Sequence, residues 1–258
     1  MPQTPPFLQR LSLITGEAGI EKLSGTGVLI FGLGGVGSWC AEALARSGAG
    51  RLVLVDSDAV CVTNINRQVQ ADFNSIGMMK AEALKARLLA INPELRVDCV
   101  TKPFDAENAA SFPFNAGAYV IDAIDSLGPK IALIQKSLSL GKTLFSSMGM
   151  AQKLDPLQIR CAGIWKTESC PLARLVRREL RKQMFTGDFT AVYSPERLPL
   201  QTAPGAPPCG GSLCLCPKTQ GAKEWCSSKK VINGSAVAVT ATAGMILASL
   251  VVRDALAR

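Results

Sequence analysis

Charged and polar side chains in the first half of the chain have the chemistry that a nucleoside triphosphate requires. A triphosphate carries about four negative charges, so cations and a metal ion must surround it. Arg67 follows an Asn-x-Asn, Lys80 begins a predicted helix, and Asp125 follows a predicted strand. Alone, Arg67 or Lys80 is typical of a solvated surface charge. Grouped with Asp56 and Asn66 after the carboxyl ends of predicted strands, where α/β folds bind ligands, they indicate an ATP site.

These side chains need a backbone that can approach phosphate, and a glycine turn supplies it. The apolar run 28–31 predicts a strand, Gly32, Gly34 and Gly37 follow as G-x-G-x-x-G, and 38–46 predicts a helix. Gly32 permits the tight turn, Gly34 lets the backbone approach a phosphate, and Gly37 lets the helix pack on the strand. The amide groups at the helix start then face an anion.

A second apolar run, 51–56, ends in Asp56, about twenty residues after Gly37, where the ribose-binding acid of a βαβ nucleotide fold is expected. The alternative is a glycine-rich turn that binds no ligand. Strand, glycines, helix, strand and acid together favour an adenine nucleotide site.

The elements that hold these residues alternate between strand and helix up to about residue 150. They are a helix over 7–24 broken near Gly16 and Gly19, a helix over 78–90, strands over 95–101 and 119–125, a helix over 130–140 and a strand over 142–147. Such alternation predicts an α/β fold with a doubly wound, mostly parallel Rossmann-like sheet in residues 1–150.

Residues 151–258 are predicted to be a C-terminal extension that completes the same domain. It holds a strand over 155–161, a helix over 172–182, a mobile Cys-rich loop over 194–230, and an apolar helix over 236–252. That last helix has the minimum length for a membrane span but carries three hydroxyl side chains, so we expect a buried helix and no membrane.

Composition narrows the chemistry further. The 258 residues include no histidine, which excludes imidazole catalysis and histidine metal ligands, and the net charge of +8 suits nucleotide or RNA. Nine cysteines and a start without signal-peptide character predict free thiols in the cytoplasm. Four of these cysteines form a weak candidate zinc site, namely Cys209, Cys214, Cys216 and Cys226.

Several motifs together resemble the E1-like, ubiquitin-activating-like superfamily. They are Gly32-x-Gly34-Gly35-x-Gly37, Asp56-x-Asp58, Asn64-x-Asn66-Arg67-Gln68, Lys80 and Asp122-x-x-Asp125. Within it the chain is most similar to the tRNA threonylcarbamoyladenosine dehydratases, through stretches such as 34–39, 58–67, 120–130 and 170–173.

The resemblance implies a role for each motif residue. The glycines would cradle the phosphates of ATP, Asp56 would hold the ribose, and Asp125 would hold Mg²⁺. Other nucleotide contacts are expected from Asp58, Asn64, Asn66, Arg67, Gln68, Lys80 and Asp122. Arg10 would reach the ATP site of a partner subunit, which implies a homodimer, although Phe7 replaces the first arginine of the usual Arg-x-x-Arg.

The implied reaction is ATP-dependent cyclisation of the threonylcarbamoyl group of tRNA through an acyl-adenylate. A helix rich in positive charge is a candidate contact for tRNA phosphates or a solvated face, with Arg174, Arg177, Arg178, Arg181 and Lys182. A cysteine desulfurase or sulfur-acceptor protein is a further candidate partner.

Three alternatives remain. An adenylyltransferase for a small sulfur-carrier protein would use a carrier's carboxylate and Cys161 or Cys170 as a thiol, but the Cys-x-x-Cys pairs of such enzymes are missing. A nucleotide-binding regulatory protein would not need the set of Arg67, Lys80 and Asp125. An NAD dehydrogenase would usually show a proton-transfer group such as histidine.

Overall fold

The computed structural model describes residues 4–197 and 233–258, and these build one seven-stranded sheet. The strand order is β3-β2-β1-β4-β5-β7-β6, and every neighbouring pair is parallel except β6 and β7. The strands are β1 (Gly27–Phe31), β2 (Arg51–Val55), β3 (Arg96–Val100), β4 (Tyr119–Asp122), β5 (Thr143–Ser147), β6 (Arg160–Gly163) and β7 (Thr190–Tyr193). The predicted doubly wound, mostly parallel sheet is confirmed.

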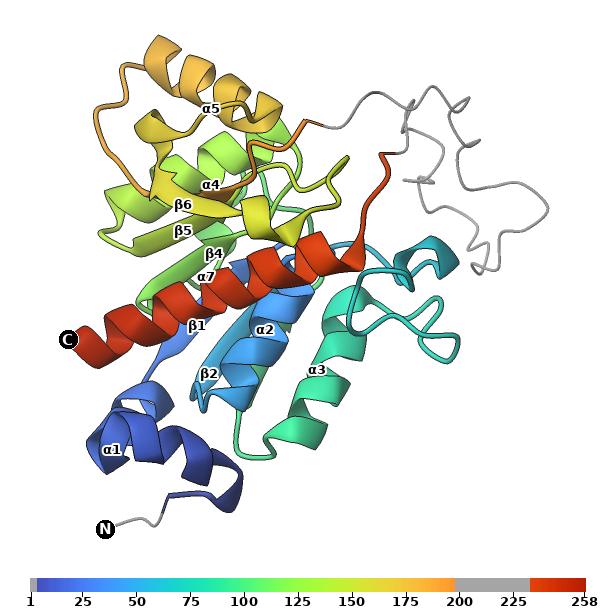
Figure 1. The fold of residues 1–258 in the computed structure, drawn as a ribbon, viewed down its shortest axis with the longest axis vertical. Helices are drawn as coiled ribbons and strands as arrows, with labels where there is room; N and C mark the ends of the chain where they lie inside the picture. Colours follow the sequence, from blue (N-terminus) through green and yellow to red (C-terminus); the bar gives the residue numbers. More distant parts are fainter. Residues whose placement is uncertain (1–3, 198–232) are drawn as a thin grey trace.

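Helices cover both faces of the sheet (Figure 1). They are α1 (Gln9–Ser24), α2 (Gly37–Arg46), α3 (Lys80–Ile91), α4 (Leu127–Ser139), α5 (Pro171–Lys182) and α7 (Val237–Ala257). Alternate residues of β1 point to opposite faces, so Val28 and Ile30 pack with α2, α3 and α7, while Leu29 and Phe31 pack with α4 and α5. Each face therefore has its own apolar core, and the predicted helix break occurs inside α1 at Gly16, where φ is +71°.

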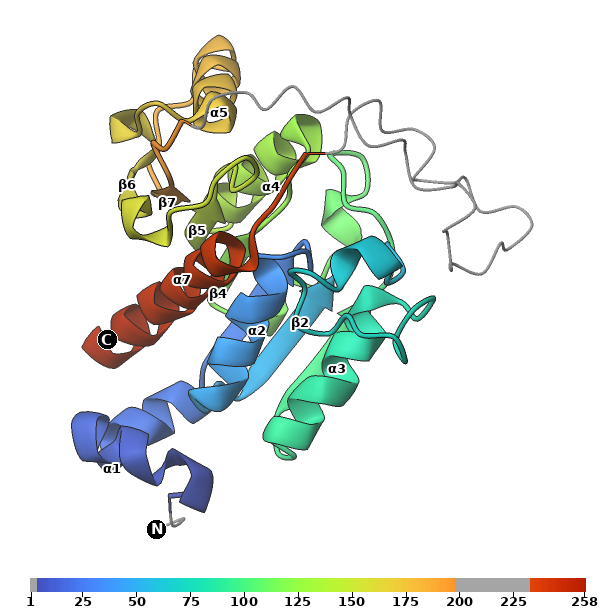
Figure 2. The same cartoon turned by 45° about the vertical axis from the view of Figure 1, so that its right-hand side comes forward.

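Helix α7 lies alongside α2 on one face of the sheet, as both views show (Figures 1 and 2). A Cβ on Gly244 would lie 2.5 Å from the Val36 carbonyl oxygen, so the two helix backbones are in close contact. At the start of α7, the Thr240 side chain lies 3.0 Å from where a Cβ on Gly35 would be. Helix α7 is long and apolar enough to cross a membrane, and in this structure its buried side chains, such as Val239, Leu247 and Val251, pack into the apolar core on the α2 face of the sheet.

The extension after residue 150 differs from its prediction in two places. The segment predicted as a strand over 155–161 begins instead as a 3-10 helix, Pro156–Gln158, and pairing starts only at Arg160. Strand β7 is not predicted by the sequence, yet it joins β5 to β6 in the same sheet. In the segment predicted as a loop over 194–230, Ser194 and Glu196 are buried, and 198–230 lie outside the described residues together with the candidate zinc cysteines.

No disulfide joins the five cysteines that lie within 4–197, which are Cys40, Cys61, Cys99, Cys161 and Cys170. Cys170 is buried at the start of α5. Cys161 lies on the edge strand β6, where partial burial of its thiol raises its pKa. A raised pKa lowers the thiolate fraction that a nucleophile needs. Cys161 therefore lacks the surroundings of an activated thiol, and Cys170 is closed to solvent.

Candidate nucleotide-binding site

The glycine turn connects β1 to α2 at the carboxyl edge of the sheet. Gly32 has φ of +87°, and a Cβ there would lie 2.7 Å from the Ala123 carbonyl oxygen. A Cβ on Gly37 would lie 1.9 Å from the Gly32 carbonyl oxygen, so only glycine allows α2 to start this close to the strand. By contrast, a Cβ on Gly34 would meet nothing within 4 Å. The backbone at Gly34 therefore faces open space, as close approach of a ligand to the turn requires.

Asp56 follows β2 and is tied directly to the glycine turn. Its Oδ2 accepts a hydrogen bond from the Leu33 amide at 2.7 Å, and its Oδ1 accepts one from the Asp58 amide at 2.8 Å. Burial raises the pKa of the Asp56 carboxyl, and the nearby ammonium of Lys80 partly opposes that rise. The carboxylate thus lies against the turn, in the position expected for a ribose ligand.

Lys80 is the first residue of α3, and its ammonium is held between two carboxylates. Nζ lies 2.6 Å from Asp58 Oδ2 and 3.9 Å from Asp56 Oδ1, and the residue is 7% exposed. An ammonium that is nearly buried and already held in place needs little further ordering to meet an anion.

The Asn-x-Asn-Arg-Gln segment forms the loop between β2 and α3. Arg67 Nη1 donates to the Thr63 carbonyl and to Asn66 Oδ1, both at 2.9 Å. The Arg67 carbonyl in turn accepts a hydrogen bond from Trp39 Nε1 of α2. Burial lowers the pKa of the Arg67 guanidinium, whereas the negative charge of Asp125 acts in the opposite direction. Arg67 and Asp125 are therefore electrostatic neighbours although they lie far apart in the sequence.

Other residues of this loop have structural roles. Asn64 is buried, and its Oδ1 accepts a hydrogen bond from the Cys61 amide, which closes the 3-10 turn Val62–Asn64. Gln68 is buried, and its Oε1 accepts a hydrogen bond from the side-chain Nε2 of Gln70 at 3.5 Å. Asn66 is exposed, and its Nδ2 donates to the Ser235 carbonyl just before α7. The loop is thus fixed by its own hydrogen bonds and by the start of the C-terminal helix.

The two aspartates after β4 differ in their surroundings. Asp122 is fully buried and forms a 2.6 Å ion pair with Lys130 of α4. Asp125 is exposed and accepts a 3.3 Å hydrogen bond from the Ser126 hydroxyl. Of these two carboxylates, only that of Asp125 is exposed. Lys130 was not among the predicted site residues, and its only signal is its spacing of eight residues from Asp122.

Arg10 does not approach the glycine turn of its own chain. It is exposed on α1, which lies at the amino end of β1, opposite the carboxyl edge (Figure 1). The structure therefore brings Asp56, Asp58, Asn66, Arg67, Lys80 and Asp125 together around the glycine turn and leaves Arg10 apart.

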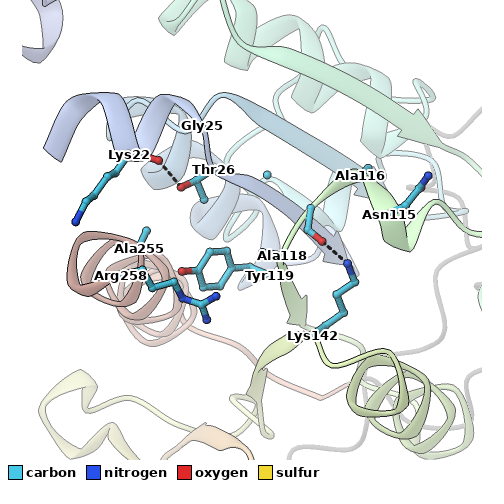
Figure 3. Close-up of a pocket in the computed structure, with 12 residues that line it drawn as sticks. Lys22, Gly25, Thr26, Asn115, Ala116, Ala118, Tyr119, Lys142, Ala255 and Arg258 are labelled. Carbon is cyan, nitrogen blue, oxygen red and sulfur yellow. Dashed lines mark hydrogen bonds between the residues drawn. The ribbon is translucent and has the colours of Figure 1, made fainter. Parts of the chain in front are cut away.

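A cavity of about 610 Å³ lies at the opposite, amino edge of the sheet (Figure 3). Among its lining residues are Thr26, Tyr119 and the cations Lys22, Lys142 and Arg258. Lys142 Nζ donates to the Gly117 carbonyl at 2.8 Å. Because the cavity lies at the amino ends of β1, β4 and β5, it takes no part in the site around the glycine turn.

A Rossmann-like sheet with this turn, an acid after the second strand and an arginine near an exposed aspartate defines an E1-like nucleotide-binding protein. Residues 8–256 match the ThiF family, and the chain belongs to that family. The predicted resemblance is confirmed.

Two relatives of known name cover 72% and 94% of the chain. The chain is 43% identical over 188 residues to the tRNA threonylcarbamoyladenosine dehydratase of Bacillus subtilis, which covers 72% of this chain and 74% of the relative. It is 36% identical over 252 residues to the enzyme of that name from Escherichia coli, covering 94% and 91%. The crystal structure of the Escherichia coli dehydratase in complex with ATP has a TM-score of 0.80 at 33% identity, covering 95% and 92%.

The raised pKa of Asp56 leads to a prediction about stability. A group whose pKa is higher in the folded protein stabilises the fold only while it is protonated, so ionised Asp56 lowers stability as pH rises through that pKa. We expect Asp56→Asn to unfold at the same or a higher temperature than the unaltered protein at about pH 7, and the difference to vanish at about pH 3, below the usual aspartate pKa of about 3.9.

Thermal unfolding at several pH values measures this effect, with Asp98→Asn as the control because Asp98 is an exposed carboxylate paired with Arg51. A loss of stability in Asp56→Asn that is largest at pH 7 would show that Lys80 outweighs burial and that the expected sign is wrong.

Proposed function

We propose that this chain is an ATP-dependent tRNA threonylcarbamoyladenosine dehydratase, acting through adenylation of the threonyl carboxylate. The observation that carries the proposal is the grouping of Arg67, Lys80 and Asp125 around the open glycine turn. It is supported by a relative of that name that aligns along nearly the whole chain. Because the substrate is tRNA, the expected compartment is the cytoplasm.

ATP would bind with its phosphates over the glycine turn. The start of α2 presents backbone amides to an anion, and Gly34 leaves room for close approach. Asp56 would accept hydrogen bonds from the ribose, and the cations Lys80 and Arg67 would neutralise the phosphates, with Asn66 beside them. We assign the buried residues Asn64, Gln68 and Asp122 to shaping the loops around the nucleotide.

Asp125 has the chemistry of a magnesium ligand. Mg²⁺ is usually held through one or two carboxylates together with substrate phosphates, without an all-protein cage. No group of three or more His, Cys, Asp or Glu side chains that could hold a metal occurs within 4–197 and 233–258. The exposed carboxylate of Asp125 instead fits a site in which one carboxylate and the substrate phosphates share the ion. A magnesium ion held there would help to neutralise charge on the phosphates.

The reaction needs no nucleophile from the protein. The threonyl carboxylate attacks the α-phosphate of ATP, the bond to pyrophosphate breaks, and an acyl-adenylate forms. The carbamoyl oxygen of the same substrate then attacks the acyl carbon, AMP leaves, and the carbamoyl nitrogen loses a proton as the oxazolone ring closes. The net change in the RNA is loss of one water. The chain contributes cations that stabilise charge on the phosphates in the transition state, which suits a protein without histidine.

A homodimer would bring Arg10 to the phosphates of a partner subunit. Helix α1, which carries Arg10, also carries large apolar side chains that are open in the monomer, since Leu13 is 87% exposed and Ile14 is 84% exposed. Adjacent exposed apolar side chains are typical of a surface that a protein covers. We therefore propose that α1 packs against a second copy and delivers Arg10 to it.

Helix α5 is our proposed contact for tRNA phosphates. Its buried side, Ala173, Val176 and Leu180, faces the core, and the opposite side exposes Arg174, Arg178, Arg181 and Lys182. Arg177 differs from the others because its Nη1 donates to Thr167. Arg181 lies over the Trp165 ring, 5.4 Å from its centroid. Four exposed cations on one helix suit a phosphate backbone.

The sulfur-carrier alternative has weaker support. A yeast protein named adenylyltransferase and sulfurtransferase is 34% identical over 136 residues, but the match covers 52% of this chain and 30% of that protein. A cysteine desulfurase or sulfur acceptor as partner stays a prediction.

The decisive assay supplies ATP, Mg²⁺ and tRNA carrying threonylcarbamoyladenosine, and follows loss of one water from the modified nucleoside by mass spectrometry. We expect Asp125→Ala to lower turnover about a hundredfold or more, as removal of one group that stabilises transition-state charge does elsewhere, while the fold is retained. Asp98→Ala is the control and should keep full activity. AMP formation only with a small carrier protein would favour the alternative, and no AMP with either substrate would indicate a regulatory protein.

If each ATP site takes Arg10 from one subunit and Asp125 from the other, two inactive variants should restore each other's activity. Arg10→Ala and Asp125→Ala should each be inactive as purified homodimers. After subunits are mixed and allowed to exchange, heterodimers contain one site with both residues, so activity should return to about a quarter of the unaltered level. Size-exclusion chromatography with light scattering checks the dimer. A monomer, or no recovery after proven exchange, would contradict the role of Arg10.

Phosphate contacts on α5 predict salt-dependent tRNA binding. Arg178→Gln should weaken tRNA binding and lower the slope of log K against log salt by roughly 1, with ATP binding unchanged. Arg96→Gln, an exposed arginine on β3, is the control. Filter binding at several salt concentrations measures both, and an unchanged slope would show that α5 presents only a solvated face.

A further inference from the structure

A fully buried ion pair lies directly beneath the loop that carries Asp125. Lys130 Nζ and Asp122 Oδ2 are 2.6 Å apart, and both side chains have no solvent exposure. Asp122 is the last residue of β4, and Lys130 lies in the first turns of α4. The pair thus spans the loop 123–126 that joins the strand to the helix.

Every polar atom of the pair has a partner. Besides Asp122, Lys130 Nζ donates to the Ser147 carbonyl at 3.0 Å and to Ser146 Oγ at 3.3 Å. Asp122 Oδ2 accepts from Ser146 Oγ at 2.6 Å, and its Oδ1 accepts from the Ile124 amide at 3.1 Å. The network therefore links the ends of β4 and β5 to α4 and to the loop itself.

A gain in the free energy of unfolding is a poor explanation for the presence of a buried ion pair. Removing two charges from water costs several kcal/mol for each ion, and well-packed apolar residues are often as stable in the same place. A fully hydrogen-bonded ion pair does, however, fix the geometry of the groups that it joins.

The loop that the pair fixes is also tied to the glycine turn. The Ala123 amide donates to the Phe31 carbonyl at 2.8 Å, and the Ala123 carbonyl oxygen lies against Gly32. At the other end, the Lys130 amide donates to the Ser126 carbonyl at 3.1 Å. Between these anchored ends lies Asp125, whose side chain is open to solvent.

We propose that Lys130, together with Asp122, is a positioning residue that sets the place of the Asp125 carboxylate for a divalent cation on the ATP phosphates. The inference rests on the proposed function, because it takes Asp125 as a ligand of the metal. Groups that orient a metal ligand typically contribute tenfold to a hundredfold to metal affinity.

The experiment measures binding of Mn²⁺, as a paramagnetic substitute for Mg²⁺, to the protein saturated with a non-hydrolysable ATP analogue. Free Mn²⁺ is followed by electron paramagnetic resonance, so no turnover is needed. The main variant is the double substitution Asp122→Asn with Lys130→Met, which removes both charges and keeps an oxygen that can accept from the Ile124 amide. Ser146→Ala is a milder second variant, because it removes the two hydrogen bonds of the Ser146 hydroxyl and leaves the ion pair in place.

A core variant separates positioning from a general loss of stability. Leu88→Ala in α3 removes a fully buried side chain away from the loop and should cost about 2–5 kcal/mol of stability. We expect the double variant to bind Mn²⁺ at least about tenfold more weakly, Ser146→Ala to fall between it and the unaltered protein, and Leu88→Ala to be unchanged. Affinity for the ATP analogue without a divalent ion should be the same in all of them.

Unchanged Mn²⁺ affinity in the folded double variant and in Ser146→Ala would overturn the inference. So would an equal loss in Leu88→Ala, because the effect would then follow stability alone. Asp125→Ala separates failure of the proposed metal role of Asp125 from failure of the inference about Lys130. If Asp125→Ala binds Mn²⁺ as the unaltered protein does, the metal role of Asp125 in the proposed function is wrong. If Asp125→Ala loses the metal while the double variant keeps it, only the inference about Lys130 fails.

Discussion

The contact between backbone and backbone at the glycine turn is the constraint on which the site depends. Because no side chain stands between Gly37 and the Gly32 carbonyl, α2 begins directly above the end of β1. That approach places the amide end of α2, the Leu33 amide that holds Asp56, and the Ala123 segment within one small region. Loops from three parallel strands then meet at this edge, since the carboxyl ends of parallel strands lie together.

Charge around the turn is arranged in opposed pairs. Lys80 lies between two carboxylates, and the negative charge of Asp125 interacts with the Arg67 guanidinium. Carboxylates of this kind hold cations in place before a nucleotide arrives, so less ordering is needed on binding. The same carboxylates would compete with the phosphates for those cations. Binding of ATP would therefore exchange one set of partners for another rather than fill an uncompensated positive site.

The sequence predicts the parts of the fold that have a clear local period. The strand and helix on either side of the glycine turn differ in period and are bounded by glycines, so 28–31 and 38–46 agree closely with β1 and α2. Strand β7 has only four residues and no period of useful length. The start of the segment 155–161 is decided by Pro156, which lacks an amide donor and begins a 3-10 turn.

The spacing of the motif residues is enough to select them from the sequence. It is not enough to predict which of their side chains are exposed and which are buried. Asp122 and Asp125 are equivalent acids in the sequence, and only the position of Lys130 under the sheet edge separates them. In the same way, the five cations of the basic helix are equivalent in the sequence, and only the hydrogen bond from Arg177 to Thr167, which lies before the helix, separates Arg177 from the others. Such differences arise from tertiary contacts, which a local pattern does not contain.

The packing of α7 has a consequence for how the protein is made. Thr240 lies against Gly35, Asn66 donates to the Ser235 carbonyl, and Gly244 allows α7 to rest on the first turn of α2. The glycine turn, residues 32–37, is synthesised early, yet the residues that pack against this region, 235–244, come some two hundred residues later. During translation the glycine turn will therefore be exposed without these contacts until residues 235–244 have left the ribosome.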